Sequence, residues 1–420
     1  MTSTPRPPRS GLRGLSPALI PLGVMFLAVG MSTAVVYPFL ALFLSKEVQA
    51  GPARVTAFLF VAPLAGVLVT QLIGRLSDRG PYRRRILVAA ALAGMAGTGL
   101  TAVVRDYWVL LGLTVTATAL SGSLFPQTFA YARQVLERDS PGRAALGISA
   151  MRTVFSLAWV GGPALAAVLL DVGGFRLLYA TAAGLFLVAA LVAALRLETI
   201  GPPPRLDDAG PAAPLQLSRV LLVATVVAFV LLQTPMTLAV QALPLFISED
   251  LHRDASAAGL ILGLCAALEI PLMLGLGVLT TRIPVRTLIL VGSAAGVVYY
   301  ALAWTAPNLW VLAAAQPVNA VFISAVSGVA ITYMQDLMPD RPGQATTLFT
   351  NTFPIGATLA GPLLGLSAHF GYRTAYGITT VVCAAGLVVL LLARPGRRVS
   401  PPATGSAAAV SDDAPAVPRP

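Results

Sequence analysis

Apolar runs of about 20 residues or more recur along this 420-residue chain, and they constrain its fold more than any other feature. A helix of 20 residues rises about 30 Å, which matches the hydrocarbon core of a bilayer. Hydrophobic residues make up 56% of the chain and charged residues only 11%, which is too apolar for a soluble domain of this length. The sequence therefore predicts an all-α membrane protein whose surroundings are a lipid bilayer.

Twelve transmembrane helices are expected, in two halves of six helices each. We expect them over residues 17–44, 55–76, 85–104, 107–132, 143–170, 175–195, 218–247, 255–281, 285–304, 307–335, 343–369 and 371–393. The domains expected from this pattern are a cytoplasmic tail (1–16), an N-terminal half (17–196), a cytoplasmic linker (197–217), a C-terminal half (218–394) and a disordered cytoplasmic tail (395–420). Prolines inside the runs are tolerated in membrane helices and should kink them.

Lysine and arginine fall mainly in alternate turns between the apolar runs. With both termini in the cytoplasm, 21 of the 28 basic residues lie in cytoplasmic segments, 6 lie in outer loops, and Arg152 lies inside the fifth run. Basic residues gather on the cytoplasmic side of membrane proteins, so the count predicts this orientation. It also explains the net charge of +11 without a nucleic-acid partner, because the arginines form no basic domain with interleaved aromatic residues.

The loop at residues 74–85 carries five arginines in twelve residues, and it returns about 203 positions later at residues 277–286. Three further pairs of short motifs recur in the same order, at offsets between 197 and 203. Each copy contains an even number of helices, so both copies share one orientation in the membrane. The halves are therefore expected to be parallel repeats, related by an axis along the membrane normal.

These motifs resemble those of a known family. The loop at 74–85 resembles the signature loop between helices two and three of the major facilitator superfamily, and Gly162-Pro163 resembles a degraded form of its antiporter motif. More narrowly, the chain is similar to the bacterial sugar efflux transporter family in residues 156–163 (Ser-Leu-Ala-Trp-Val-Gly-Gly-Pro), 267–271 (Ala-Leu-Glu-Ile-Pro), 333–338 (Tyr-Met-Gln-Asp-Leu-Met) and 345–351 (Ala-Thr-Thr-Leu-Phe-Thr-Asn).

The resemblance implies a secondary active transporter of a bacterial cell membrane, which exports sugars or sugar-like molecules by alternating access in exchange for protons. It also implies a conformational lock, in which Asp78 pairs with an arginine at the cytoplasmic end of helix four and holds the outward-facing state. We choose Arg133 as that partner. The loop residues assigned to the same lock are Gly74, Arg79 and Arg83. The second copy has Thr281 in place of Asp78, so it cannot form a mirrored lock.

Arg152 and Glu269 are the ionisable residues placed deepest in the apolar runs. Such side chains are costly in a membrane and usually functional. The superfamily fold implies that helices five and eight face each other, so Arg152 could reach Glu269. We predict that Glu269 binds a sugar hydroxyl or a proton and that Arg152 tunes it. The alternative is a static buried ion pair that only fixes the register of the helices.

Six further polar or aromatic residues are candidates for sugar contacts, because sugars are bound by amides, carboxylates and aromatic faces. They are Tyr37, Gln127, Trp159, Gln241, Asn319 and Asn351. The two aromatic residues could instead pack between helices. Likewise, Gln127 and Asn319 could form hydrogen bonds between helices instead of contacting a ligand.

Several functions are not expected from the sequence. Neither His252 nor His369 has a second histidine at ligand spacing, so no metal site is expected, and no cofactor motif is present. No nucleophile and base occur together, so an enzyme is not expected. The alternatives that stay open are a multidrug exporter of the same fold and a membrane sensor that does not transport. A monomer is expected.

Overall fold

The computed structural model describes residues 19–77, 79–139, 144–201, 218–339 and 341–394, and these residues form helices and turns with no strand among them. The N-terminal half contains α1 (Leu19–Val36), η1 (Tyr37–Phe39), α2 (Leu40–Lys46), α3 (Pro52–Ser77), α4 (Arg83–Thr101), α5 (Tyr107–Leu113), η2 (Thr114–Thr118), α6 (Ala119–Ser121), α7 (Leu124–Asp139) and α8 (Ala144–Arg196). The C-terminal half contains α9 (Arg219–Leu245), η4 (Phe246–Asp250), α10 (Ala257–Leu279), α11 (Val285–Thr305), α12 (Leu309–Ile323), η5 (Ser324–Val329), α13 (Ala330–Leu337), α14 (Pro342–Phe370) and α15 (Arg373–Leu392).

These elements agree with twelve membrane crossings. Within the described residues, ten helical segments are long and apolar enough to span a membrane. One of them lies in α8, whose 53 residues are interrupted at Gly174 by a backbone conformation of φ 60° and ψ −160°, so that it crosses twice. A twelfth crossing is α4, which begins with three arginines and is not among the ten. Positive φ is accessible to glycine at little cost, which explains the reversal at Gly174.

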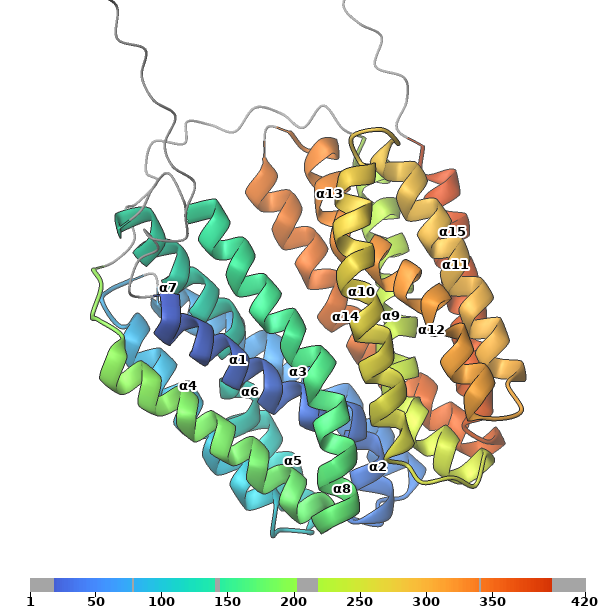
Figure 1. Ribbon diagram of the computed structural model, residues 1–420, viewed down its shortest axis with the longest axis horizontal. Helices are drawn as coiled ribbons and strands as arrows, with labels where there is room; N and C mark the ends of the chain where they lie inside the picture. The colour runs from blue at the N-terminus through green and yellow to red at the C-terminus, as the bar shows by residue number, and fades with distance from the viewer. Residues whose placement is uncertain (1–18, 78, 140–143, 202–217, 340, 395–420) are drawn as a thin grey trace, which may run out of the picture.

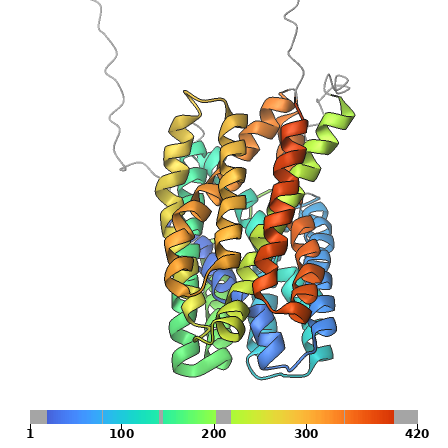
Figure 2. The same ribbon diagram turned by 90° about the vertical axis from the view of Figure 1, so that its right-hand side faces the viewer.

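The two halves form two helical bundles that lie side by side (Figure 1), and Figure 2 shows the C-terminal bundle face-on. We call the end where α1 begins and α15 ends the tail side. We call the opposite end, where α2 ends and α15 begins, the loop side. The bundles tilt relative to each other and approach most closely at the bottom of Figure 1, which is the loop side.

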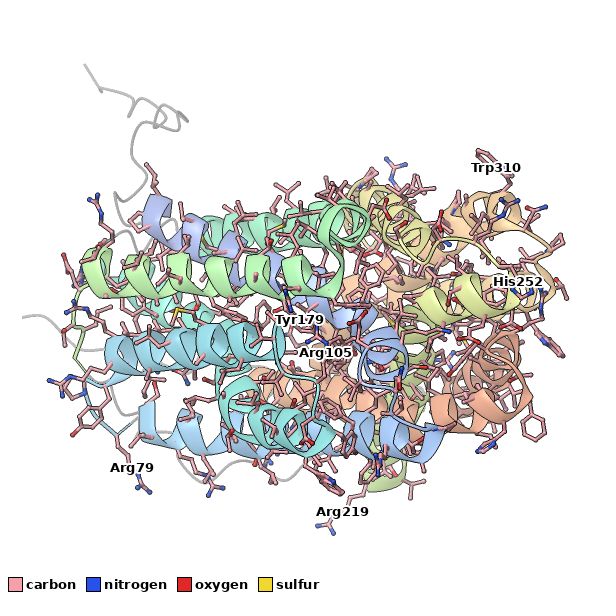
Figure 3. All side chains as sticks on the ribbon, turned by 90° about the horizontal axis from the view of Figure 1, so that it is seen from below. Arg79, Arg105, Tyr179, Arg219, His252 and Trp310 are labelled. Atoms are coloured by element: carbon pink, nitrogen blue, oxygen red, sulfur yellow. The ribbon has the colours of Figure 1, made fainter. Side chains whose placement is uncertain are left out.

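The repeat predicted from the sequence is visible in packing on the loop side. In the N-terminal half the guanidinium group of Arg105 lies 5.2 Å from the ring centroid of Phe43, and that ring lies 4.8 Å from the ring of Tyr179. Figure 3 shows Arg105 and Tyr179 side by side. Arg105 also donates hydrogen bonds to the carbonyl oxygens of Thr101 and Ala102, which end α4. One arginine thus joins three helices of the half.

The C-terminal half repeats this arrangement with an arginine from another segment. Arg373 lies 5.1 Å from the ring of Phe246, which lies 5.2 Å from the ring of Tyr376. Arg373 donates to the carbonyl oxygens of Trp304 and Ala306 at the end of α11. The phenylalanines are 203 positions apart and the tyrosines 197, which are offsets of the sequence repeat.

On the tail side, a second pair of arginines corrects the alignment of the repeat by one residue. Arg84 donates to the carbonyl oxygen of Ala193 near the end of α8, at 3.4 Å, and Arg286 donates to that of Leu390 near the end of α15, at 2.8 Å. The sequence comparison had matched Arg286 with Arg83. The structural equivalent of Arg286 is Arg84, because both cap the last helix of their half.

The buried core is shared between the halves on the loop side only. One cluster of buried hydrophobic residues contains Phe43 and Phe58 from the N-terminal half together with Phe246 and Tyr376 from the C-terminal half. A second cluster, around Phe26 on the tail side, contains residues of the N-terminal half alone. The hydrophobic effect therefore holds the halves together at the loop side.

Candidate functional site

The seam between the halves is closed on the loop side by two contacts in which glycine lets backbones approach. Where α8 meets α10, a Cβ atom on Gly263 would lie 3.2 Å from the carbonyl oxygen of Val160, and one on Gly259 would clash with that of Pro163. Where α3 meets α14, a Cβ atom on Gly361 would lie 2.9 Å from the carbonyl carbon of Leu59. Larger residues at these glycines would push the halves apart.

Charged and polar groups reinforce this closure. Lys46 at the end of α2 forms an ion pair with Glu249 in η4, which joins the two halves. The side chain of Ser45 lies near the hydroxyl group of Tyr372. Burial raises the pKa of the Tyr372 hydroxyl above its usual range, and the carboxylates of Glu249 and Asp250 act in the same direction. On the loop side, polar contacts between the halves thus lie beside the apolar contact that closes the seam.

The tail side of the same seam is exposed. Arg152 lies on α8 eleven residues before Pro163, which places it about 20° around the helix from the face that reaches the seam, whereas Asn351 lies on α14 ten residues before Gly361, about 80° around the helix. Both side chains are exposed. Polar side chains at this depth need water or polar partners. The seam is therefore closed at the loop side, and Arg152 and Asn351 are exposed nearer the tail side.

A kink in the first crossing places an aromatic pair at the seam. Pro38 has no N–H to donate to the helix, and the chain changes from α1 to a 3₁₀ turn at Tyr37. At this point Gly162 of α8 packs against Ala34, which brings the neighbouring turn of α8 close. The rings of Tyr37 and Trp159 meet edge to face, with centroids 6.2 Å apart. Both rings belong to the N-terminal half.

The C-terminal half meets this pair with a polar stripe on α9. Gln233, Thr237 and Gln241 are spaced by four residues, so they lie on one helix face, and all three are buried. The hydroxyl group of Tyr37 faces Thr237 and Gln241 across the seam. Yet three of these polar atoms make no hydrogen bond within the described residues: the hydroxyl oxygens of Tyr37 and Thr237, and the side-chain carbonyl oxygen of Gln233.

Buried polar atoms are almost always hydrogen-bonded, so three unpaired atoms at one seam indicate a site for water or a ligand. The sequence analysis had named Tyr37, Trp159 and Gln241 but had missed Gln233 and Thr237. The spacing of four residues from Gln241 was the signal that could have found them.

Glu269 lies in α10 and is partly buried. Its carboxylate accepts a hydrogen bond from the Cys265 thiol at 3.5 Å, and its backbone carbonyl oxygen accepts one from the Ser324 hydroxyl at 3.3 Å. Asn319 donates to the sulfur of Cys265 at 3.3 Å. Glu269 and Asn319 therefore belong to one polar cluster inside the C-terminal half.

Arg152 and Glu269 form no ion pair, although α8 and α10 do face each other. Glu269 follows Gly263 by six residues, which places it about 120° around α10 from the face that contacts α8. It points toward α12 instead, whereas Arg152 stays at the exposed seam. Counting residues from the helix ends estimates how deep Arg152 and Glu269 lie in the membrane, but it does not give the direction of their side chains.

The lock residues lie on the tail side, and Asp78 lies outside the described residues. Arg133 forms an ion pair with Glu137 on its own helix at 2.6 Å. The Arg83 side chain, which is buried, donates to the Ser77 hydroxyl at 3.0 Å, and Ser77 donates to Gln127 at 2.8 Å. These two bonds join α3, α4 and α7, so Gln127 makes a bond between helices.

The remaining lock residues are less constrained by their surroundings. Arg79 is exposed and projects from the end of the molecule in Figure 3. A Cβ atom on Gly74 would meet no atom within 4 Å. Among the residues that the structure describes, neither makes a side-chain contact that would fix a role in this conformation.

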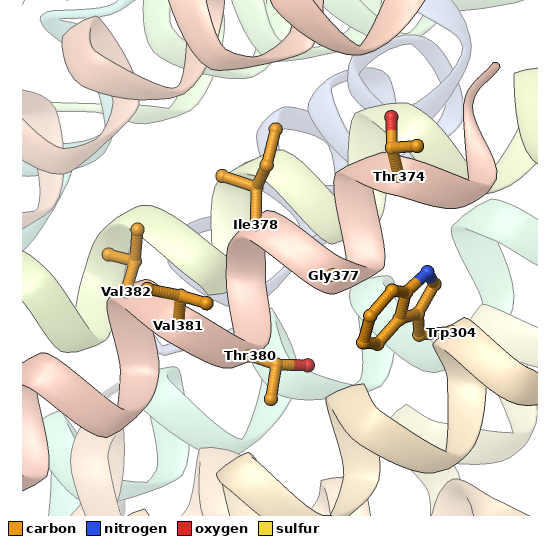
Figure 4. A pocket seen from close by; sticks show the side chains of 7 residues that line it. All are labelled: Trp304, Thr374, Gly377, Ile378, Thr380, Val381 and Val382. Atoms are coloured by element: carbon orange, nitrogen blue, oxygen red, sulfur yellow. The ribbon is translucent and has the colours of Figure 1, made fainter. Parts of the chain in front are cut away.

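A hollow of about 410 Å³ lies outside the seam, between α11 and α15 (Figure 4). Trp304 forms one wall, and Gly377, Ile378 and Val381 line the other. It contains none of the predicted site residues, and it is almost wholly apolar. A hollow of this kind on membrane-spanning helices suits a hydrocarbon chain better than a sugar.

The fold and its seam can now be compared with known proteins. Residues 22–240 and 221–418 each match the family described as Major Facilitator Superfamily. The chain belongs to this superfamily. Within it, the chain is 34% identical to the "Sugar efflux transporter A" of Dickeya chrysanthemi, over 87% of this chain and 93% of that protein. It is also 34% identical to a "Putative sugar efflux transporter" of Deinococcus radiodurans, over 88% and 95% of the two chains.

The superfamily fold is also found in solved structures. The crystal structure of the nucleoside transporter NupG matches with a TM-score of 0.74 at 12% identity, covering 90% of this chain and 99% of that one. At this identity the likeness shows the fold alone. The protein is thus a multi-pass membrane protein of a transporter superfamily, and the residues at its seam bear on what it carries.

Proposed function

We propose that this superfamily member is a secondary transporter that exports sugars or sugar-like small molecules from the cytoplasm of a bacterium, in exchange for protons and by alternating access. Relatives named sugar efflux transporters, 34% identical over most of the chain, support the substrate class. The observation that carries the proposal is the set of unpaired polar atoms at the seam, at Tyr37, Thr237 and Gln233.

A sugar would satisfy these atoms. Its hydroxyl groups can donate and accept, and so can the hydroxyl of Tyr37 and the amides of Gln233 and Gln241. The apolar face of a sugar ring would lie against Trp159, which is partly buried at the same place. Asn351 and Arg152 would meet the substrate nearer the tail side, where both are exposed. Gln127 and Asn319, which bond to other helices, would support the helices that carry the site.

Glu269 is the proposed proton site. A carboxyl group within a membrane-spanning helix is costly, and here its side-chain partner is a thiol, with no cation paired to it among the described residues. It can therefore bind and release a proton without breaking an ion pair. Arg152, on the neighbouring α8, would respond to that charge through space, and through contact only if the helices rotate.

The tail side is proposed to face the cytoplasm of a bacterial cell membrane, because 21 basic residues belong to that side and 6 to the other. The conformation described here is then open inward. In the outward-facing state the proposed lock would form between Asp78 and Arg133, with Gly74, Arg79 and Arg83 shaping the loop. A monomer with the predicted domain boundaries at 16–17, 196–197, 217–218 and 394–395 suffices for this cycle.

The test uses purified protein in vesicles and a panel of labelled sugars and drugs, with and without an imposed pH gradient. We expect sugar efflux that a pH gradient accelerates. Glu269→Gln should keep sugar counterflow, which needs no net proton movement, and lose the response to the gradient. Asp254→Asn, the same change at an exposed loop-side carboxylate, should leave both intact.

Three outcomes would contradict this proposal. A gradient response that survives in Glu269→Gln would remove Glu269 from the proton step. Efflux of drugs with no transport of any sugar would favour a multidrug exporter of the same fold. Neither sugar nor drug movement would favour a sensor.

A further inference from the structure

A chain of hydrogen bonds leads from Glu269 into the core of the C-terminal half. The Cys265 thiol donates to the Glu269 carboxylate at 3.5 Å, and Asn319 donates to the Cys265 sulfur at 3.3 Å. The same side-chain nitrogen of Asn319 donates to the side-chain carbonyl oxygen of Gln316 at 3.1 Å. The Gln316 amide nitrogen donates to the Tyr299 hydroxyl at 3.3 Å. Five side chains on α10, α12 and α11 are thereby connected.

This chain borders a small enclosed cavity. The cavity has a volume of about 20 Å³ and lies between α9, α10, α11, α12 and α15. Asn319, Tyr299, Tyr300 and Tyr376 supply polar groups to a lining that is otherwise apolar. Asn319 is 7% exposed, and its side-chain carbonyl oxygen has no hydrogen-bond partner among the described residues.

The volume and the chemistry of this cavity fit a single water molecule. About 10 to 15 Å³ is enough to hold one water, provided that it finds two or more polar partners. A water here can donate to the unpaired oxygen of Asn319. The hydroxyl group of Tyr299 accepts a bond from Gln316 and still has its own hydrogen to donate to that water.

We propose that one water molecule occupies this cavity, and that Cys265 and Asn319 are positioning residues which link the protonation state of Glu269 to that water and so to α9. The inference rests on the proposed function, in which Glu269 exchanges the proton. It assigns to Asn319 a part in proton coupling in place of a direct sugar contact.

The chain can reverse its direction when Glu269 takes up a proton. The ionised carboxylate accepts the thiol hydrogen of Cys265, as described. A protonated carboxyl group donates to the sulfur instead, and the thiol hydrogen then turns toward Asn319. Asn319 answers by presenting its oxygen to the thiol and its nitrogen to the water. Gln316 and Tyr299 can reverse in the same way without a proton leaving the network, but Gln316 then gives up the hydrogen bond that its amide nitrogen donates to the carbonyl oxygen of Leu312 at 3.0 Å.

Within the part of the chain that the structure describes, Glu269 is the only carboxyl group in this cluster. Among the described residues, the other titratable side chains of this cluster are Cys265 on its own helix, Tyr299 and Tyr300 on α11 and Tyr376 on α15. Tyr376 is already engaged as a donor to the carbonyl oxygen of Ala239, at 3.3 Å. A change of charge near neutral pH within the cluster therefore originates at Glu269.

The water would lie against the helix that carries the seam residues. Met236, Ala239 and Val240 line the cavity from one side of α9, while Thr237 and Gln241 face the seam from the other. A rearrangement at the water thus changes the packing behind the proposed substrate contacts. This is a physical route from the proton site to the substrate site within one half of the protein.

The test measures the pH dependence of sugar efflux by the full-length protein in vesicles. Cys265→Ala removes the donor to the ionised carboxylate, so Glu269 should keep its proton to higher pH. We expect the midpoint of the pH profile to rise by about 0.5 to 1 pH unit. Asn319→Leu should raise it as well. Cys265→Ser keeps a donor and an acceptor and should restore the original midpoint.

Cys383→Ala is the matched control. Cys383 is also buried, but it donates to the carbonyl oxygen of Ser293 and takes no part in the hydrogen bonds that lead from Glu269 to Tyr299. Its loss should therefore leave the midpoint of the pH profile unchanged. An unchanged midpoint in both Cys265→Ala and Asn319→Leu would overturn the link. A high-resolution structure of the wild-type protein without density for water in this cavity would overturn the water site, whether or not the variants fold.

These outcomes are distinct from failure of the proposed function. If Glu269→Gln keeps its response to a pH gradient, the proton site itself is wrong. If Glu269→Gln loses that response while Cys265→Ala keeps the wild-type midpoint, only the link is wrong.

Discussion

Replacing Gly361 with alanine is expected to drive this protein out of the loop-closed conformation. The added Cβ atom would lie 2.9 Å from the carbonyl carbon of Leu59 and from the backbone nitrogen of Phe60. Non-bonded carbon atoms prefer about 3.5 to 4.0 Å, so α14 and α3 must separate by at least about 0.6 Å. Both neighbours are backbone atoms, and neither can turn aside as a side chain would.

The cost falls on one conformation only, because α3 and α14 must part on the loop side when the seam opens there. Inserting a methyl group into a tight contact costs about 1 to 3 kcal/mol. The ratio of loop-closed to loop-open molecules should therefore fall by about 5-fold to 150-fold. Sugar efflux should slow accordingly, because the state accessible from the tail side is then rarely occupied.

Spin labels at the exposed residues Arg75 and Arg282, on the tail sides of the two halves, measure this equilibrium through their distance distribution. The variant should show shorter distances than the wild-type protein, since closing the tail side accompanies opening of the loop side. Gly66→Ala is the matched control, because Gly66 lies on the partner helix α3 and a Cβ atom there would meet nothing within 4 Å. If Gly361→Ala and Gly66→Ala give the same distances and the same efflux, the assignment of this contact as the closure is wrong.

Two further predictions concern charges on either side of the membrane. Lys46→Glu should lower the loop-closed population up to about fivefold, because the ion pair with Glu249 is about half exposed and worth about 0.2 to 1 kcal/mol. Adding Glu249→Lys should restore the loop-closed population in the same distance measurement. Asp78→Asn should raise the loop-closed population by removing the proposed lock of the opposite state, whereas unchanged transport and unchanged distances would exclude the lock.

The fold was predictable because membrane crossings and repeats leave strong signals in a sequence. Long apolar runs, the charge asymmetry of the turns and four recurring motifs placed most helix ends to within about three residues, but the crossing predicted to end at residue 132 continues to Asp139. The sequence did not predict the local backbone geometry within the helices. The π-helical turns at Thr114–Thr118 and Ser324–Val329 occur in equivalent crossings of the two halves, yet the residues in them share no pattern with a known signal.

The candidate site was only partly predictable, because depth is easier to count than direction. Tyr37, Trp159 and Gln241 were named as candidate sugar contacts, and the structure brings them together at one seam, but their contact with sugar stays a prediction. Glu269 was placed at a suitable depth, but its pairing with Arg152 required a side-chain direction that only the rotation of α10 decides. Arg84 and Arg83 differ by one position, and one position turns a helix by about 100°.

The two sites proposed here differ in how they would respond to the transport cycle. The stripe on α9 faces Tyr37 and Trp159 across the seam, so opening the loop side must pull these groups apart and release whatever they hold. The chain from Glu269 to Tyr299 lies wholly within the C-terminal half, and it survives the same movement. Opening of the loop side therefore changes the substrate contacts directly, whereas it leaves the hydrogen bonds around the proton site intact. If protons drive the cycle, their effect must reach the seam through α9, the helix that borders both.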